Sequence, residues 1–272
     1  MLKKRLITAL VILPLLVAAV WFDKPLPWLT IVVAIWGVLA AFEFYRVVKT
    51  SNVLPLIGFG LIWTLFFIIS PHCDWAYINP LLLTSAVVLP LIWLLARRQK
   101  EGAFISWAWT IAGILYVGWL LSHFIALRGM DFAGIEEAGR NLVFFALLTT
   151  FASDSAAYFV GRAWGRRRLA PGISPGKTWE GAIGGILFAI ITGQLLVMLL
   201  DLPLSYWQAI PLAMAVSIFG QAGDLVESLF KRNMGVKDSG KILPGHGGFL
   251  DRMDSIVFAG VVVYYYVILF IG

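Results

Sequence analysis

Acidic and basic side chains gather in three stretches of an otherwise apolar chain, and one of these runs from Asp224 to Arg232. Asp224, Glu227, Ser228 and Lys231 recur at intervals of three and four residues, so they share one face of a helix. Acids near the end of an apolar helix are costly unless they are paired or bound to a cation. Glu227 has Lys231 one turn away as a salt-bridge partner. Glu227 can therefore have either a structural role or a role in substrate binding. Asp224 has no base one turn away on either side, and we predict that it is a metal ligand.

The densest polar stretch covers residues 237–254. Asp251 and Asp254 stand three residues apart at the start of the last apolar segment, where their carboxylates would suit Mg²⁺, which takes one or two protein carboxylates together with waters and phosphates. Glycines here let the backbone approach an anion closely. Acids that hold a metal among bases that hold phosphate are typical of phosphoryl and nucleotidyl transfer. The other residues of this stretch that we predict at the site are Lys237, Asp238, Lys241, Gly247, Gly248 and Arg252.

His246 stands between glycines in the same stretch. A phosphate monoester is already anionic near neutral pH, so a phosphate nucleophile needs no general base. We therefore predict that His246 contacts the substrate through a hydrogen bond and does not act as a base.

The third stretch runs from Ser153 to Glu180. Asp154 falls inside an apolar segment, about two turns from its end, where an acid is either functional or hydrogen-bonded to another helix. Lys177 and Thr178 resemble the end of a P-loop, but Gly172 stands one residue too close and we expect no strand before it. We predict instead that Ser174 to Lys177 cap a helix opening at Thr178 and contact phosphate. The predicted substrate-binding residues of the three stretches are Ser153, Asp154, Arg162, Ser174, Lys177, Thr178, Glu227, Ser228, Lys231, Arg232, Asp238, His246, Gly247 and Gly248.

The elements that must position these residues are membrane helices. Hydrophobic residues make up 60% of the 272 residues and charged residues 13%, against roughly 45–50% and about 25% in soluble proteins. The lone Cys73 excludes an intrachain disulfide and a cysteine-based zinc cluster. We predict an all-α, polytopic membrane protein. Nine stretches approach the length of about 20 apolar residues that a spanning helix needs: Leu6–Phe22, Trp28–Val48, Leu54–Ser70, Pro80–Ala96, Phe104–Leu127, Asn141–Val160, Gly181–Leu200, Tyr206–Phe230 and Ser255–Ile271.

Basic residues predict the orientation of these spans. Of the 21 Lys and Arg residues, all but Lys24, Arg128 and Arg140 fall on one side of the nine-span arrangement. Because cytoplasmic loops carry the excess of Lys and Arg, the N-terminus is predicted inside and the C-terminus outside. The net charge of +6 then reflects anionic lipid and not nucleic acid. We predict a scaffold at residues 1–140 that makes the dimer and lipid contacts, and four spans at 141–272 whose two cytoplasmic loops form the active site.

The order of these polar residues resembles a known family. Ser228 through Asp254 are similar to the signature of the phosphatidate cytidylyltransferases, also called CDP-diglyceride synthases. The similarity covers the Lys-Arg, Lys-Asp, Pro-x-His-Gly-Gly and Asp-Arg-x-Asp groups at their separations. A second region of the family is resembled by Ser153-Asp154, Tyr158, Gly161-Arg162 and Ser174-Pro-x-Lys-Thr-Trp-Glu-Gly181.

This resemblance implies the reaction CTP + phosphatidate → CDP-diacylglycerol + diphosphate in a bacterial inner membrane, with the active site facing the cytoplasm. It also implies Mg²⁺, which a second monovalent or divalent cation could accompany, and a homodimer. Asp224 and Asp251 would be the metal ligands, with Asp254 close by. Lys237, Lys241, His246 and Arg252 would line the nucleotide and phosphate pocket.

Two other classes of protein share some of these features. A transporter of anionic solutes also has many spans and acids within the membrane, but its polar sites lie near the bilayer midplane and often in two related halves. Here the polar groups gather at one end of the last four predicted spans, and no paired half is evident. A CDP-alcohol phosphotransferase would carry a run of aspartates along Asp-Gly-x-x-Ala-Arg, which this chain lacks.

Overall fold

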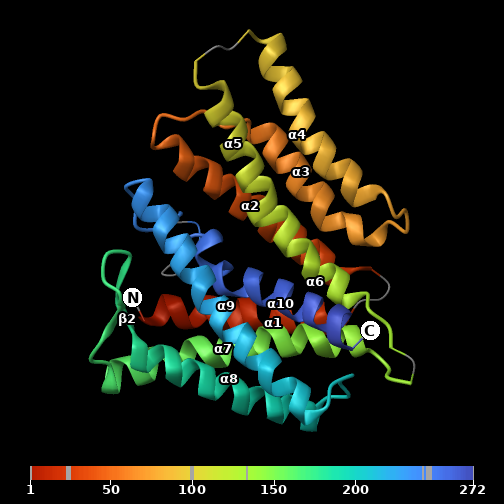
Figure 1. The fold of residues 1–272 in the computed structure, drawn as a ribbon, viewed down its shortest axis with the longest axis vertical. Helices are drawn as coiled ribbons and strands as arrows, with labels where there is room; N and C mark the ends of the chain where they lie inside the picture. The colour runs from red at the N-terminus through yellow and green to blue at the C-terminus, as the bar shows by residue number, and fades with distance from the viewer. Residues whose placement is uncertain are drawn as a thin grey trace. The chain divides into compact units, whose positions relative to one another are not determined.

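The computed structural model describes residues 2–22, 26–98, 101–132, 134–240, 242 and 247–271, with side chains described from Ile12 onward. These residues are mostly helical (Figure 1), as expected of long apolar segments that must satisfy their own backbone hydrogen bonds in lipid. They form two compact units. The first unit combines Met1–Ile125 with Asn233–Arg252, and the second combines Ala126–Arg232 with Met253–Gly272. The polar segment after residue 232 thus belongs to the same unit as the N-terminal helices, whereas the predicted division grouped it with the last four spans.

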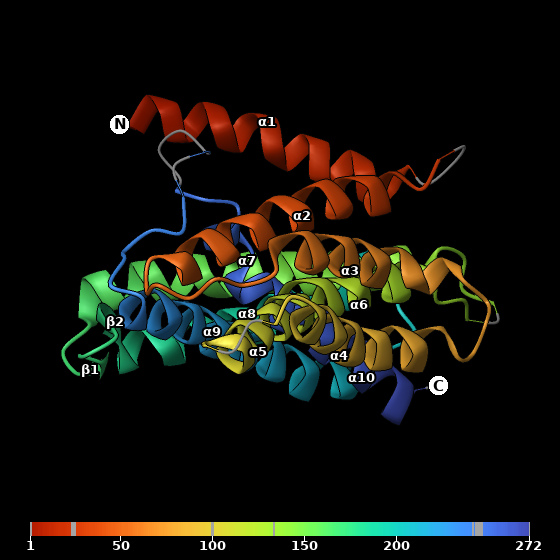
Figure 2. The same ribbon diagram turned by 90° about the horizontal axis from the view of Figure 1, so that it is seen from above.

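The first unit contains the N-terminal helices. These are α1 (Leu2–Trp21), α2 (Trp28–Lys49), α3 (Ile57–Ile69), a 3₁₀ turn η1 (Ser70–His72) and α4 (Ile78–Ala96). Next come α5 (Ala103–Gly113), one π-helical stretch η2 (Ile114–Trp119) and α6 (Leu120–Arg128). These last three form one continuous rod that ends in the second unit. α3 and α4 lie side by side in both views (Figures 1 and 2).

A buried tyrosine fixes α2 within this unit. Tyr45 is fully buried, and its hydroxyl donates a hydrogen bond of 2.8 Å to the carbonyl oxygen of Thr110 on α5. The Thr110 hydroxyl oxygen accepts a bond of 2.8 Å from the backbone N–H of Leu56, just before α3. These two contacts join three helices around the cytoplasmic half of α2 in the predicted orientation.

The second unit is built from α7 (Ala138–Trp164), α8 (Trp179–Leu199), α9 (Tyr206–Asn233) and α10 (Asp254–Phe270). α7 and α8 run alongside each other in both views (Figures 1 and 2). The connection between them is an antiparallel hairpin of β1 (Arg168–Ala170) and β2 (Ser174–Thr178), in which Arg168 pairs with Thr178.

This hairpin corrects the all-α prediction locally, and also the expectation that no strand precedes Gly172. Its strands are short and polar and give no apolar alternation that a sequence pattern could detect. Contacts at its base hold it instead. The Glu180 carboxylate accepts backbone hydrogen bonds from Arg166 at 3.0 Å and Arg167 at 3.2 Å. Thr178 is the N-cap of α8 and accepts from the Gly181 N–H at 3.2 Å. The helix thus begins one residue after the predicted position, and the predicted capping residues Ser174 to Lys177 form a strand instead.

Six helices within the described ranges are long and apolar enough to cross a membrane, which makes this a multi-pass membrane protein. They are Trp28–Lys49, Ile78–Ala96, Ala103–Arg128, Ala138–Trp164, Trp179–Leu199 and Tyr206–Asn233. Three shorter apolar helices, Ile12–Trp21, Ile57–His72 and Asp254–Phe270, coincide with the other three predicted spans. The count of nine and the orientation of the termini stay predictions.

Candidate active site

The C-terminal end of α9 carries the first predicted cluster on one helix face. Glu227 and Lys231 form the ion pair that their spacing suggested, with 2.9 Å between Oε1 and Nζ, and the Glu227 side chain is fully buried. Of the two roles left open for Glu227, the structure therefore shows the salt bridge. The Ser228 hydroxyl donates to Asp224 Oδ1 over 3.4 Å. Asp224 is partly exposed, so its carboxylate can meet a ligand.

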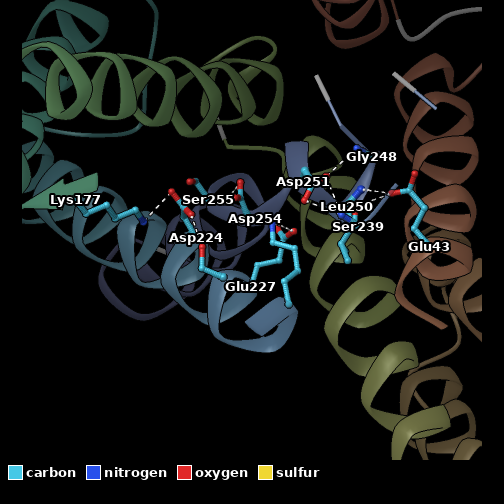
Figure 3. A network of polar contacts seen from close by, with 12 residues as sticks. Glu43, Lys177, Asp224, Glu227, Ser239, Gly248, Leu250, Asp251, Asp254 and Ser255 are labelled. Carbon is cyan, nitrogen blue, oxygen red and sulfur yellow. Dashed lines mark hydrogen bonds and ion pairs between the residues drawn. The ribbon is translucent and has the colours of Figure 1, made fainter. Parts of the chain in front are cut away.

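The β hairpin supplies the base that α9 itself lacks beside Asp224. Lys177 on β2 places its Nζ 2.7 Å from Asp224 Oδ2, and both side chains remain partly exposed, at 23% and 35% (Figure 3). The Lys177 nitrogen is itself buried, so the partly exposed Asp224 carboxylate is the member of this pair that a metal bound to phosphate can reach. Sequence spacing could not reveal this pair, because its members are separated by a helix and a loop.

Two further carboxylates belong to the same unit as Asp224. The Ser255 hydroxyl donates to the carboxylate of Asp154 on α7, and the backbone N–H of Ser255 donates to Asp254 Oδ1 at 2.8 Å. Asp224 interacts electrostatically with both Asp154 and Asp254. Figure 3 shows Asp224, Asp254 and Ser255 as neighbours. Three helices thus contribute acids to one region.

A glycine makes this approach possible. A Cβ built on Gly223 of α9 would run into the carbonyl oxygen of Asp254 and would lie 2.6 Å from the Phe258 ring. The α9 and α10 backbones therefore touch at Gly223, which brings Asp224, the next residue, to the start of α10.

The chemistry of this donor set fits Mg²⁺ that arrives with phosphate. Across the ranges that the structure describes, no three His, Cys, Asp or Glu side chains are gathered so as to hold a metal by themselves. Mg²⁺ usually needs only one or two carboxylates and takes its remaining ligands from water and substrate phosphates. Asp224, with Asp154 and Asp254 near it, would meet that requirement once a nucleotide supplied the rest.

The second predicted metal ligand, Asp251, lies in the first unit and orders its own loop. Asp251 is 8% exposed. Its carboxylate accepts from the Ser239 N–H at 3.1 Å and from the Gly248 N–H at 2.8 Å (Figure 3). Its loop-closing role is the one that the contacts display.

The remaining residues of the polar segment flank that loop. Lys237, Asp238 and Arg252 are exposed. Gly247 has φ of +84°, a left-handed conformation that favours glycine. The predicted site residues Lys241 and His246 lie outside the described residues.

Ser153 connects helices in the second unit. It is 1% exposed, and its hydroxyl oxygen is 2.7 Å from that of Ser217 on α9. Gln221 Nε2 donates to the same Ser217 oxygen at 3.0 Å. These bonds join α7 to α9, as small polar residues often do between membrane helices. The substrate-binding role predicted for Ser153 stays a prediction.

The other predicted residues of the second unit surround the hairpin. Arg162 donates to the Tyr158 hydroxyl at 3.0 Å and is exposed. Arg232 Nε donates to the Ile173 carbonyl oxygen at 3.4 Å. Ser174 is half-buried at the start of β2. Of the two arginines, Arg232 from α9 therefore contacts the hairpin turn, whereas Arg162 bonds to its own helix.

Sequence reasoning missed Glu43. This acid lies in an apolar span, and it is 2% exposed. Its Oε2 accepts from the Ser239 hydroxyl and from the Leu250 N–H, each at 3.0 Å. An ionisable residue inside a predicted span itself indicates a function, and this rule could have identified Glu43 from the sequence.

This is a helical membrane protein with acids, lysines and glycines near its helix ends. Those residue types in that setting suit a nucleotidyltransferase that acts on a lipid. The chain belongs to the cytidylyltransferase family, whose sequence pattern matches residues 3–270. It is 37% identical over 245 residues to the phosphatidate cytidylyltransferase of Bacillus subtilis, and the aligned region covers 89% of each chain. It is 34% identical to that of Staphylococcus saprophyticus over 84% of this chain and 86% of the relative. The phosphatidate cytidylyltransferase of Brucella suis is 43% identical over 63% of this chain and 60% of its own.

Proposed function

We propose that this protein transfers the cytidylyl group of CTP to phosphatidate, which yields CDP-diacylglycerol and diphosphate. The observation that carries the proposal is the likeness to proteins named phosphatidate cytidylyltransferase over nearly the whole chain. The structure supports it with the partly exposed carboxylate of Asp224, whose Oδ2 lies 2.7 Å from Lys177 Nζ. A membrane location supplies the lipid substrate.

The reaction is an in-line displacement. A phosphate oxygen of phosphatidate forms a bond to the α-phosphorus of CTP, while the bond from that phosphorus to the bridging oxygen of the diphosphate breaks and diphosphate leaves. The nucleophile is already anionic, so no residue has to remove a proton, and no covalent enzyme intermediate is needed. Lys177, beside Asp224, would neutralise phosphate charge as it redistributes. The exposed Lys237 and Arg252 stay predicted phosphate contacts.

Of the predicted ligands Asp224, Asp251 and Asp254, the first and the last would hold Mg²⁺, which would withdraw charge from the phosphates. The contacts give these residues unequal support. Asp224 and Asp254 interact electrostatically within one unit. The Asp251 carboxylate instead accepts hydrogen bonds from Ser239 and Gly248 in its own loop. Asp154 adds a further acid to the Asp224 region.

The setting of the reaction follows from the charge pattern. The polar segments lie on the Lys- and Arg-rich side of the predicted spans, which is the cytoplasmic side, where CTP is available. We place the protein in the inner membrane of a bacterium with its active site facing the cytoplasm, and we assign it a homodimeric state.

The decisive experiment uses purified full-length protein in mixed micelles that contain phosphatidate, CTP and Mg²⁺. Diphosphate and CDP-diacylglycerol should appear in equal amounts. Replacing phosphatidate with diacylglycerol, which lacks the attacking phosphate, is the matched control and should give neither product.

Two outcomes would contradict this proposal. Release of CMP from CDP-diacylglycerol on addition of an alcohol, without synthesis from CTP, would assign the protein to the phosphotransferases. Uptake of phosphate compounds into vesicles, again without synthesis, would assign it to the transporters.

A further inference from the structure

Glu43 on α2 is a buried acid that the proposed reaction does not use. It is 2% exposed, and a buried carboxylate costs several kcal/mol unless hydrogen bonds satisfy it. Its Oε2 accepts two such bonds, from the Ser239 hydroxyl at 3.0 Å and from the Leu250 backbone N–H at 3.0 Å. Both donors belong to the polar segment 237–252, and they lie at its opposite ends. One oxygen atom of α2 therefore joins both ends of that segment (Figure 3).

Asp251 closes the same segment from within. It accepts from the Ser239 N–H at 3.1 Å and from the Gly248 N–H at 2.8 Å. Ser239 is thus held twice, by its backbone through Asp251 and by its hydroxyl through Glu43. Asp251 closes the loop, and Glu43 attaches the closed loop to α2.

Two glycines show how closely the segment fits against Glu43. A Cβ on Gly248 would collide with Glu43 Oε2 and with the Ser239 hydroxyl, and a Cβ on Gly240 would collide with Glu43 Oε1. The loop backbone therefore packs directly against both oxygens of the carboxylate. Trp36, on the same helix, adds a third attachment, because its Nε1 donates to the Phe249 carbonyl oxygen at 3.0 Å.

We infer that Glu43 is a positioning residue for cytidylyl transfer, which holds the two described ends of the segment, 237–240 and 247–252, together through Ser239 and Leu250. The inference rests on the proposed function, because the segment contains Lys237 and Arg252 and, between the two tied points in the sequence, Lys241 and His246. Without the tie, the ends of the segment would be free to separate, and the phosphate-binding groups would be aligned only part of the time.

The first test compares Glu43→Gln with Glu43→Ala. A glutamine oxygen can accept from Ser239 and Leu250 as Oε2 does, so Glu43→Gln should keep kcat within about threefold of the parent. Alanine removes both acceptors and should lower kcat about a hundredfold, which corresponds to one or two charge-assisted hydrogen bonds. KM for CTP should change much less than kcat. Glu136, an exposed acid outside the predicted site, is the matched control, and its Gln and Ala variants should behave like the parent.

The second test is a double-mutant cycle with Ser239. Ser239→Ala removes one of the two bonds and should lower kcat roughly tenfold. Because Ser239 acts through Glu43, the double variant should be no worse than Glu43→Ala alone. Effects that simply multiply would contradict the coupling.

Limited trypsin digestion tests the tie without any reference to activity. Trypsin cleaves after Lys237 and Lys241, so loss of the tie should raise the cleavage rate there about tenfold or more in Glu43→Ala, and leave it near the parent's rate in Glu43→Gln. Cleavage after Arg98 should stay the same in all variants. Gly248→Ala, which pushes the loop off an intact Glu43, should reproduce the local increase.

These results separate the inference from the proposed function. If the parent protein fails to use CTP but the local cleavage pattern appears, the tie exists and the proposed reaction is wrong. If Glu43→Gln is as inactive as Glu43→Ala, the charge itself is required and Glu43 is not a positioning residue. Parent-like kinetics and cleavage in Glu43→Ala, or increased cleavage at every site, would overturn the inference.

Discussion

At the scale of residues, Asp224 joins a lysine and two further acids in one unit. Lys177 Nζ lies 2.7 Å from its Oδ2, and its charge interacts with those of Asp154 and Asp254. An acid in these surroundings is stabilised by cations, and a divalent ion bound with nucleotide would serve best.

Asp224→Ala should therefore nearly abolish turnover while the protein still folds. The loss of one metal ligand typically removes several kcal/mol of transition-state stabilisation, which is on the order of a thousandfold in rate. The measurement is kcat over a range of Mg²⁺ concentrations, with Asp74→Ala, an exposed acid far along the chain, as control. A variant that retains more than about a tenth of the rate would show that Asp224 is not an essential ligand.

His246 poses a different question, because a base is not needed if phosphate is the nucleophile. His246→Asn should retain part of the activity, since an amide still donates a hydrogen bond. His246→Ala should lose more, roughly ten- to hundredfold. The pH–rate profile of the Asn variant should keep the acidic limb of the parent.

A general base would give another pattern. The Asn and Ala variants would be equally inactive, and the limb near the usual histidine pKa of about 6.5 would disappear. That pair of results would contradict direct attack by the lipid phosphate.

The sequence predicted some of these residues and missed others for a physical reason. Glu227 and Lys231 are four residues apart, and helix geometry alone pairs them. Lys177 and Asp224, or Glu43 and Ser239, are brought together only by tertiary packing, which no local spacing encodes. Glu43 was still visible as an acid inside an apolar span, without any indication of its partner.

At the scale of elements, contact between α9 and α10 decides how the acids meet. Gly223 allows that contact, because a Cβ there would collide with the Asp254 carbonyl oxygen. Gly223→Ala should force the two helices apart, shift Asp224 relative to Asp254 and lower kcat about tenfold or more.

Gly220, one turn earlier on α9, provides the matched control for this prediction. A Cβ there would have its nearest neighbour, the Ser255 carbonyl oxygen, at 3.5 Å, an ordinary contact distance. Gly220→Ala should retain parent activity and leave thermal stability the same or slightly higher, because alanine favours helix over glycine. Equal activity loss in both variants would mean that α9 is sensitive to substitution in general. Equal activity retention would mean that the α9–α10 contact does not set the geometry.

The helices themselves could be predicted from apolar length, and the start of α8 to within one residue, but its cap and the hairpin could not. Its strands cover only Arg168–Ala170 and Ser174–Thr178, and Glu180, from outside both strands, holds its base. The π-helical turn Ile114–Trp119 was likewise not expected, since the sequence there reads as continuous apolar helix.

At the scale of the whole molecule, the distribution of basic residues predicts which side of the membrane each loop occupies. Single cysteines placed at Arg98, Arg167 and Lys241 in a protein without Cys73 should react with a membrane-impermeant reagent only from the cytoplasmic side. A cysteine at Asp201 should react only from outside. These expectations follow from nine alternating spans with the N-terminus inside.

The native Cys73 gives an internal reference for this experiment. It is an exposed free thiol in a connection that the nine-span arrangement places outside. The unmodified protein should therefore be labelled in intact cells. Labelling of the cysteine at position 201 from the cytoplasm, or of the cysteine at position 167 from outside, would overturn the arrangement.

The bond between Glu43 and Ser239 also sets an order of events during synthesis. Ser239 is made 196 residues after Glu43, so the ribosome has completed most of the helices before the partner of that carboxylate exists. Until then the Glu43 carboxylate has neither of the two donors, Ser239 and Leu250, from which it accepts in the finished structure. The last polar segment therefore completes a structure begun in one of the first helices, and a nascent chain that stops before Ser239 leaves that acid without its partners.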